Sequence, residues 1–201
     1  MATYYYNGAQ ILAPLSIVSN HPIYDAETVS LKKIRATQGH QRWELSFECL
    51  ANNNIANMFI DSIKDVNLPK TMIMPQIKEV YELNTLQGVA NIHTSEVSNS
   101  STVSITNNAY ISGILKKGSF VKFSEHNKVY VLTSDLNMSK NSTFETMNIF
   151  PSLKAPVIND VLKYGDNCEI TYFQDISNLQ GMSFTDGILA DMGSINLQEA
   201  L

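Results

Sequence analysis

The sequence predicts a mainly β protein with one short helix, built as a discontinuous β domain into which a small barrel is inserted. Three observations lead to this fold class. Short runs of alternating or β-branched residues recur along the chain, separated by turns rich in Asn, Ser and Gly. Five such runs follow one another in the middle of the chain, which is typical of a small closed barrel. Strand-like runs similar to those of the first third then occur again at the C-terminal end.

The first third predicts strands followed by one helix. Residues 42–48 alternate between apolar and polar side chains, as in a half-buried antiparallel strand. The run 28–35 alternates in part, and the turn at 38–40 predicts that it pairs with 42–48 as a hairpin. Apolar residues at helical spacing predict a short helix at about 55–65, which Pro69 closes.

The middle of the chain supplies the strands of the predicted barrel. Phe120 and Phe123 fall on opposite faces of one of these strands by alternation, so some aromatic surface is a candidate for exposure. Packing in the core is the favoured interpretation, and an exposed ring that stacks nucleic acid or sugar is the alternative. The five predicted strands are 89–94, 102–106, 119–124, 128–133 and 145–150.

The C-terminal part predicts two more strands, at 168–174 and 194–199. The economical interpretation is that residues 1–86 and 168–201 form one β domain, and that residues 87–167 form the inserted barrel. A tandem pair of domains is the alternative, but the last stretch is too short to bury a core of its own.

Charge and hydropathy exclude several classes of function. The formal net charge is −5 and the fourteen basic residues are scattered, whereas binding to nucleic acid phosphates needs clustered Lys and Arg. We therefore expect no sequence-specific nucleic acid partner. No apolar run has the length of a membrane span, and the N-terminus lacks a secretory signal, so we expect no membrane anchor and synthesis in a cytoplasm.

The sequence presents no catalytic constellation. Paired carboxylates could serve a glycosidase, but the acidic residues flank turns or occupy the polar side of strands, where solvated carboxylates normally lie. No Gly-rich phosphate loop and no zinc spacing occurs, so we predict no cofactor, no metal site and no enzymatic activity. Surface or turn positions are the expected interpretation for the four histidines, His21, His40, His93 and His126.

Two further features have a structural interpretation. Cys49 and Cys168 lie in apolar, alternating contexts, which indicates buried thiols, although a disulfide between them stays open. The aromatic tract at residues 4–6 is interpreted as a first strand, and an interaction segment is the alternative.

The segments 114–136 and 147–156 resemble a pattern that recurs in phage tail proteins. A Lys-containing turn ending in Gly leads to an apolar strand, then to a Val-Tyr strand after a lysine, and finally to a strand that closes on Pro and Leu. Ser119 stands where the pattern usually has an acidic residue. An Arg-Trp strand near the N-terminus and the ending SINLQEAL are similar to the same proteins. The residues that carry the resemblance are Arg42, Trp43, Gly118, Lys128, Val129, Tyr130, Pro151 and Leu153.

The family indicated by this resemblance is that of the Dit-like distal tail proteins of long-tailed siphophages. It implies a β-sandwich-like domain that builds a hexameric ring at the tip of the tail tube, with an inserted barrel of the OB type. It also implies a channel for DNA, contacts with the tube protein on one side and contacts with tail-tip or hub and fibre proteins on the other. A receptor- or carbohydrate-binding module of the tail tip is the alternative function, and a wall hydrolase is a third.

Overall fold

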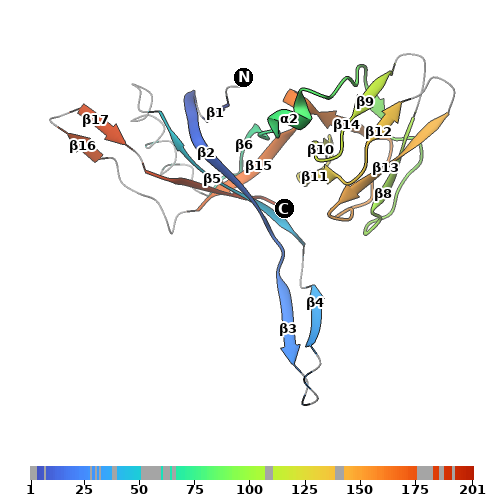
Figure 1. Cartoon of the computed structure of the whole chain (residues 1–201), viewed down its shortest axis with the longest axis horizontal. Helices are drawn as coiled ribbons and strands as arrows, with labels where there is room; N and C mark the ends of the chain where they lie inside the picture. Colours follow the sequence, from blue (N-terminus) through green and yellow to red (C-terminus); the bar gives the residue numbers. More distant parts are fainter. Residues whose placement is uncertain are drawn as a thin grey trace. The chain divides into compact units, whose positions relative to one another are not determined.

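A computed structural model gives the fold of the chain (Figure 1). The chain divides into two compact units. The first comprises Met1–Tyr4, Lys70–Thr171 and Leu201, and the second Tyr5–Pro69 and Tyr172–Ala200. The predicted fold class is confirmed, because most elements of both units are strands. The structure describes residues 4–6, 8–27, 29, 31, 33–37, 40–50, 60, 64, 67–106, 111–138, 143–175, 183–185, 188–191 and 193–201.

The second unit contains an antiparallel sheet that joins the two ends of the chain. Its hydrogen-bonded order runs β1-β2-β5-β18-β15, and the last residues of β15 belong to this unit. The strands predicted at 42–48, 168–174 and 194–199 are confirmed as members of this sheet. Their bounds are β1 (Tyr5–Tyr6), β2 (Ala9–Asn20), β5 (Arg42–Cys49), β15 (Glu169–Gln174) and β18 (Ile195–Glu199).

Alternation in β5 places its large apolar side chains on one face of this sheet. Trp43, Leu45 and Phe47 are buried, while the residues between them are half-buried or exposed. The first strand adds Tyr6, whose ring meets that of Phe47 edge-on with the centroids 5.4 Å apart. The interpretation of the tract 4–6 as a first strand is confirmed for Tyr5 and Tyr6, which pair with β2, whereas Tyr4 lies just before the strand. Each of these buried side chains contributes about 1.5–3 kcal/mol of transfer free energy.

A two-stranded hairpin follows β2, and it corrects one prediction. β3 (Ile23–Glu27) pairs with β4 (Lys33–Thr37) in an antiparallel ladder. The predicted pairing of 28–35 with 42–48 is wrong, because both edges of β5 are occupied by β2 and β18. Alternation predicts that a segment is a strand but carries no information about which strand becomes its partner.

The first unit contains a second antiparallel sheet, of six strands. Its order is β7-β14-β10-β11-β13-β8. All five predicted barrel strands are found here; β14 was not predicted. An OB-fold has five strands, so the OB assignment stays a prediction. The bounds are β7 (Ala90–Asn91), β8 (Thr102–Thr106), β10 (Phe120–Phe123), β11 (Val129–Leu132), β13 (Phe144–Phe150) and β14 (Val161–Tyr164).

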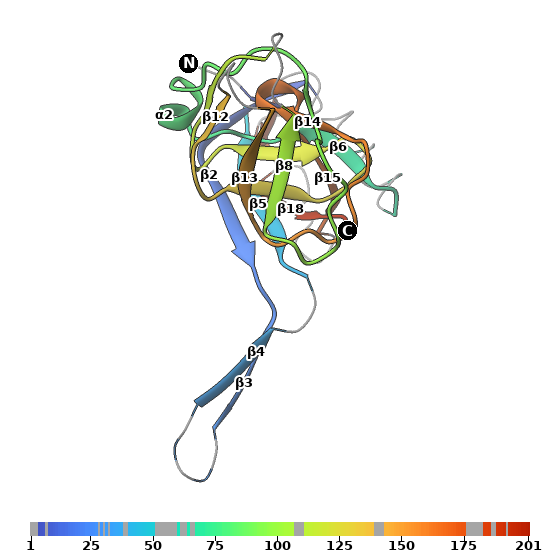
Figure 2. The ribbon, with the colours of Figure 1, turned by 90° about the vertical axis from the view of Figure 1, so that its right-hand side faces the viewer.

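The two outer strands of this sheet meet, so that the sheet nearly closes into a barrel. An isolated antiparallel bridge joins Ile92, just after β7, to Ile105 in β8. The amide of His93 donates to the carbonyl of Ser104 over 2.7 Å beside that bridge. Figure 2 shows β8 and β13 side by side on this barrel. The buried apolar side chains of the barrel form one cluster. Its members come from sequence positions between Leu86 and Leu162 and include Phe123, Tyr130 and Met147.

Both faces of β10 are buried, which alternation alone does not predict. Val121 and Phe123 belong to the barrel core. On the other face, the Phe120 amide donates to the side-chain oxygen of Gln76 over 3.0 Å, and Lys122 Nζ donates to Thr171 Oγ1 over 3.2 Å. The aromatic residues of β10 are thus core residues, as favoured, and Phe120 offers no exposed stacking surface.

The remaining elements are short. The helix predicted at about 55–65 lies outside the described residues, except for Ile60 and Lys64. Gly113 has φ +106, and a Cβ built there would lie 2.2 Å from the Thr85 carbonyl oxygen, so only glycine fits. The other elements are β6 (Lys70–Ile73), α2 (Lys78–Tyr81), β9 (Gly113–Leu115), β12 (Leu136–Met138), the 3-10 helix at Gly165–Asn167, β16 (Ser183–Thr185) and β17 (Ile188–Asp191).

Candidate functional site

A polar network covers the less buried face of the sheet in the second unit. Asn20 Nδ2 donates to Glu44 Oε1 over 2.7 Å, and Gln198 Nε2 donates to the same oxygen over 3.2 Å. Arg42 Nη1 in turn donates to Gln198 Oε1 over 3.4 Å. These residues come from three adjacent strands and point to the face opposite the apolar side chains of β5. The network therefore orients one carboxylate and one guanidinium on an accessible surface.

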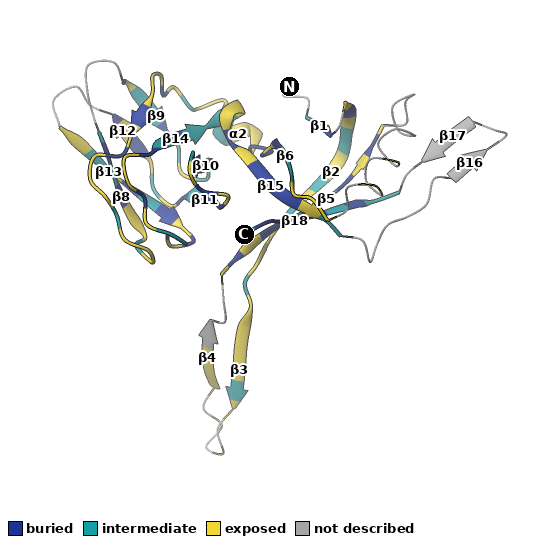
Figure 3. Cartoon of the chain, turned by 180° about the vertical axis from the view of Figure 1, so that it is seen from behind, coloured by how far each residue is buried: buried dark blue, intermediate teal, exposed yellow. Residues whose placement is uncertain are grey.

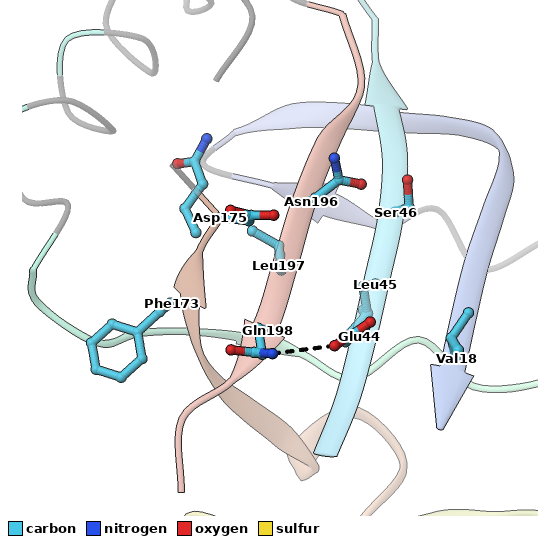
Figure 4. A pocket seen from close by; sticks show the side chains of 10 residues that line it. Val18, Glu44, Leu45, Ser46, Phe173, Asp175, Asn196, Leu197 and Gln198 are labelled. Atoms are coloured by element: carbon cyan, nitrogen blue, oxygen red, sulfur yellow. Dashed lines mark hydrogen bonds between the residues drawn. The ribbon is translucent and has the colours of Figure 1, made fainter. Parts of the chain in front are cut away.

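Next to this network the sheet is hollowed. The hollow has a volume of about 550 Å³, and Figure 4 shows the Glu44–Gln198 hydrogen bond at one side of it. Asp175 supplies a second carboxylate that the sequence did not single out, because it follows β15 rather than alternating within it. The hollow is open and combines polar with apolar side chains, so it suits docking through both hydrogen bonds and apolar contacts. Its lining is Val18, Glu44, Leu45, Ser46, Phe173, Gln174, Asp175, Asn196, Leu197 and Gln198.

The residues that carry the family resemblance do not converge on one site. Arg42 and Trp43 lie in β5, where Arg42 is exposed and Trp43 is buried, with its amide donating to Glu199 Oε2 over 3.1 Å. The other six lie in the first unit. Gly118 occupies a turn at φ +90, and the remaining five are buried: Lys128, Val129, Tyr130, Pro151 and Leu153.

The buried His126 links the turn between β10 and β11 to the segment that follows β13. His126 Nδ1 lies 3.3 Å from the Tyr130 hydroxyl, and His126 Nε2 lies 3.2 Å from the Pro156 carbonyl oxygen. The same hydroxyl accepts a hydrogen bond from the Lys154 amide over 3.2 Å. His126 is only 9% exposed, so it is not a surface histidine, but the predicted turn position is confirmed, because its amide donates to the Phe123 carbonyl over 3.1 Å. These hydrogen bonds hold the segment after β13 against β11.

Asp160 is the second buried polar anchor of the barrel. Its carboxylate accepts hydrogen bonds from the Ser124 hydroxyl, from the Glu125 amide over 3.1 Å and from the Val161 amide over 2.6 Å. Burial alone would raise the pKa of Asp160, but these hydrogen bonds outweigh burial and hold its pKa below the usual value. This geometry is that of a structural carboxylate, which ties the end of β10 to the start of β14.

The two cysteines are free, buried thiols, in agreement with the first interpretation. Burial raises the pKa of Cys49 to about 11, so this thiol is protonated at neutral pH and a poor nucleophile. Over the residues that the structure describes, no group of three or more His, Cys, Asp or Glu side chains could hold a metal ion. No helix within the described ranges is long and apolar enough to cross a membrane.

The fold is that of a β-rich protein, with buried polar anchors in one unit and an open sheet face that bears a polar network in the other. Residues 84–161, about two fifths of the chain, match the family model described as "Distal tail protein pb9, B domain". This match to the middle of the chain supports the resemblance to the Dit-like distal tail proteins of bacteriophages. No curated protein shows significant sequence similarity to it.

The matched domain supports a coarse assignment of function. A distal tail protein domain supports a structural role in the phage tail, a place in the tail of the virion and association with other tail proteins. The match includes the barrel strands from β7 to β13 and all the resembling residues from Gly118 to Leu153. Arg42 and Trp43 lie outside the matched segment.

Proposed function

We propose that six copies of this chain form a ring at the distal end of the tail tube. The ring joins the tube protein to the tail-tip or hub and fibre proteins, and its centre is a channel for DNA. The observation that carries this proposal is the β3–β4 hairpin, whose exposed apolar face needs a protein partner. A neighbouring copy of the chain supplies that partner in a closed ring.

The hairpin is exposed on both faces. In Figure 3, β3 is coloured mostly as exposed. Within the described residues β3 and β4 pair with each other and with no further strand. An isolated two-stranded hairpin is at best marginally stable in water. If this hairpin is stably ordered, a second protein surface has to cover it.

The two faces of the hairpin differ in chemistry. One face carries charges in complementary positions: Asp25 lies opposite Arg35, with Arg35 Nε 3.4 Å from Asp25 Oδ2, and Glu27 lies opposite Lys33. The other face carries Tyr24, which is 54% exposed, and Ile34, which is 49% exposed. Such an amphipathic hairpin fits docking with its apolar face inward and its charged face in water.

The sheet of the second unit offers a further means of association. β1 pairs with β2 only at Ala9 and Gln10, so no described strand pairs with that edge of β2 from Ile11 onward. Unpaired edges of this kind can pair with another chain. The polar sheet face around Glu44, together with the net charge of −5, supports a channel wall that does not retain DNA phosphates.

The test is electron microscopy and mass photometry of the purified protein and of virion tail tips. We expect rings with six-fold symmetry for the natural chain, and single subunits for the double variant Tyr24→Ser with Ile34→Ser. The matched control is Asp25→Asn with Arg35→Gln, which changes the charged face of the same hairpin and should keep the rings. Rings that persist in the Tyr24/Ile34 variant, or a lone subunit attached to a fibre in the virion, would contradict the proposal.

A further inference from the structure

We propose that the outer face of the barrel around His93 and Phe144 binds neutral pyranose sugars. The two rings stack with their centroids 5.0 Å apart and their planes at 12°. Both side chains are exposed, and 45% of Phe144 remains accessible. This site lies on the barrel rather than on the hairpin, so it goes beyond ring formation and does not depend on it.

The barrel fixes this aromatic pair on the two sides of β8. Phe144 in β13 lies directly opposite Thr106 in β8. His93 approaches β8 from its other edge, through the 2.7 Å hydrogen bond from its amide to the Ser104 carbonyl. The two rings thus contact each other over β8, at the place where the barrel closes. Because the stack already restricts both side chains, a ligand that binds there loses little rotamer entropy.

A carboxylate is held beside the aromatic pair. Glu96 Oε1 accepts hydrogen bonds from Ser104 Oγ over 3.3 Å and from Thr94 Oγ1 over 3.2 Å. Among the described residues these bonds reach only Oε1, which leaves Oε2 for a ligand hydroxyl. Hydrogen bonds to a charged acceptor are roughly twice as strong as neutral ones. Glu96 therefore supplies the polar part of a site whose apolar part is the His93–Phe144 pair.

The charge of this face selects the class of ligand. Neither residues 90–106 nor residues 144–150 contain a Lys or Arg, whereas eight of the seventeen residues in 90–106 are Ser or Thr. A nucleic acid strand needs basic residues along its phosphates, and Glu96 would repel them. A neutral sugar instead presents C–H groups that are attracted to the negative face of an aromatic ring. Its hydroxyls can donate to Glu96 and exchange hydrogen bonds with the neighbouring Ser and Thr.

The test titrates the full chain with maltoheptaose, cellohexaose and chitohexaose, by calorimetry and by ligand-observed NMR. We expect saturable binding of at least one of the three, with Kd of about 1 mM or below. Phe144→Ala should weaken this binding about tenfold, which corresponds to the loss of one stacking partner. Glu96→Gln should also weaken it, by a smaller factor. Tyr5→Ala is the matched control, since Tyr5 is also an exposed aromatic residue, 59% accessible, but lies in the other unit, and it should bind as the natural chain does.

Four results would overturn the proposal. They are the absence of saturable binding for all three sugars up to about 10 mM, unchanged binding by Phe144→Ala, loss of binding by Tyr5→Ala, and binding of a short oligothymidylate through Phe144 in place of the sugars. Thermal unfolding of each variant checks that it folds. Where Phe144→Ala lowers stability, His93→Ala removes the other ring of the stack and is expected to weaken sugar binding in the same way.

Discussion

Asp160 shows how a single buried carboxylate stabilises the barrel. Replacing it by Asn puts an NH2 group where the carboxylate accepts hydrogen bonds from Ser124, Glu125 and Val161. We expect Asp160→Asn to lower the free energy of unfolding by about 2–3 kcal/mol, because donors that are buried in the fold lose a charged acceptor. Urea unfolding at neutral pH measures this loss.

The same residue makes stability depend on pH. The pKa of Asp160 in the folded chain lies below its value in the unfolded chain. Its contribution is therefore fully present above the unfolded pKa of about 3.9 and is lost as the pH falls through the folded pKa. Asp160→Asn should lose less stability than the natural chain between about pH 5 and about pH 2. Asp135→Asn is a control, because Asp135 pairs with Lys116 on the surface and should change neutral stability little. Equal acid sensitivity of the natural chain and Asp160→Asn would count against this role.

At the scale of elements, the β3–β4 hairpin and β5 should differ in hydrogen exchange. β5 is paired along both edges, whereas β3 and β4 pair with each other alone in the described structure. We expect the amides of 23–27 and 33–37 to exchange much faster than those of 43–48 in the isolated subunit. In the assembled tail tip the hairpin amides should become protected, if a neighbouring copy covers them. Mass spectrometry of exchanged peptides gives both measurements, and strong hairpin protection in the isolated subunit would contradict this expectation.

At the scale of the whole molecule, the two units should differ in their capacity to fold alone. The barrel core lies entirely between Leu86 and Leu162, within one continuous segment of the chain. The other sheet needs β5 and β18, which lie far apart in the sequence. We expect a fragment of residues 70–171 to fold cooperatively and a fragment of residues 1–69 to stay unfolded. Near-ultraviolet circular dichroism and denaturant titration test both, and an unfolded 70–171 fragment would show that the barrel depends on the second unit.

Much of the fold could be predicted because a strand with one buried face has a local alternation of apolar and polar side chains in the sequence. The alternation of 42–48 predicts β5, since one face of that strand is apolar and buried. β14 was not predicted, because its four residues show only a weak alternation and Lys163 interrupts their apolar run. The hydrogen-bonded carboxylates of the candidate sites, Glu44 and Asp160, look like ordinary solvated acids in the sequence. Their partners come from strands distant in the chain, so only the folded chain brings them together.

The sequence by itself predicted the mainly β class, the five strands in the middle of the chain and the strands at 42–48, 168–174 and 194–199. These features follow from side-chain periodicity and turn composition, which act over a few residues. The tertiary structure decided the pairing of β4 with β3, the burial of both faces of β10 and the burial of His126. It also decided that His93 meets Phe144 across β8. These features depend on contacts between residues far apart along the chain, which no local pattern encodes.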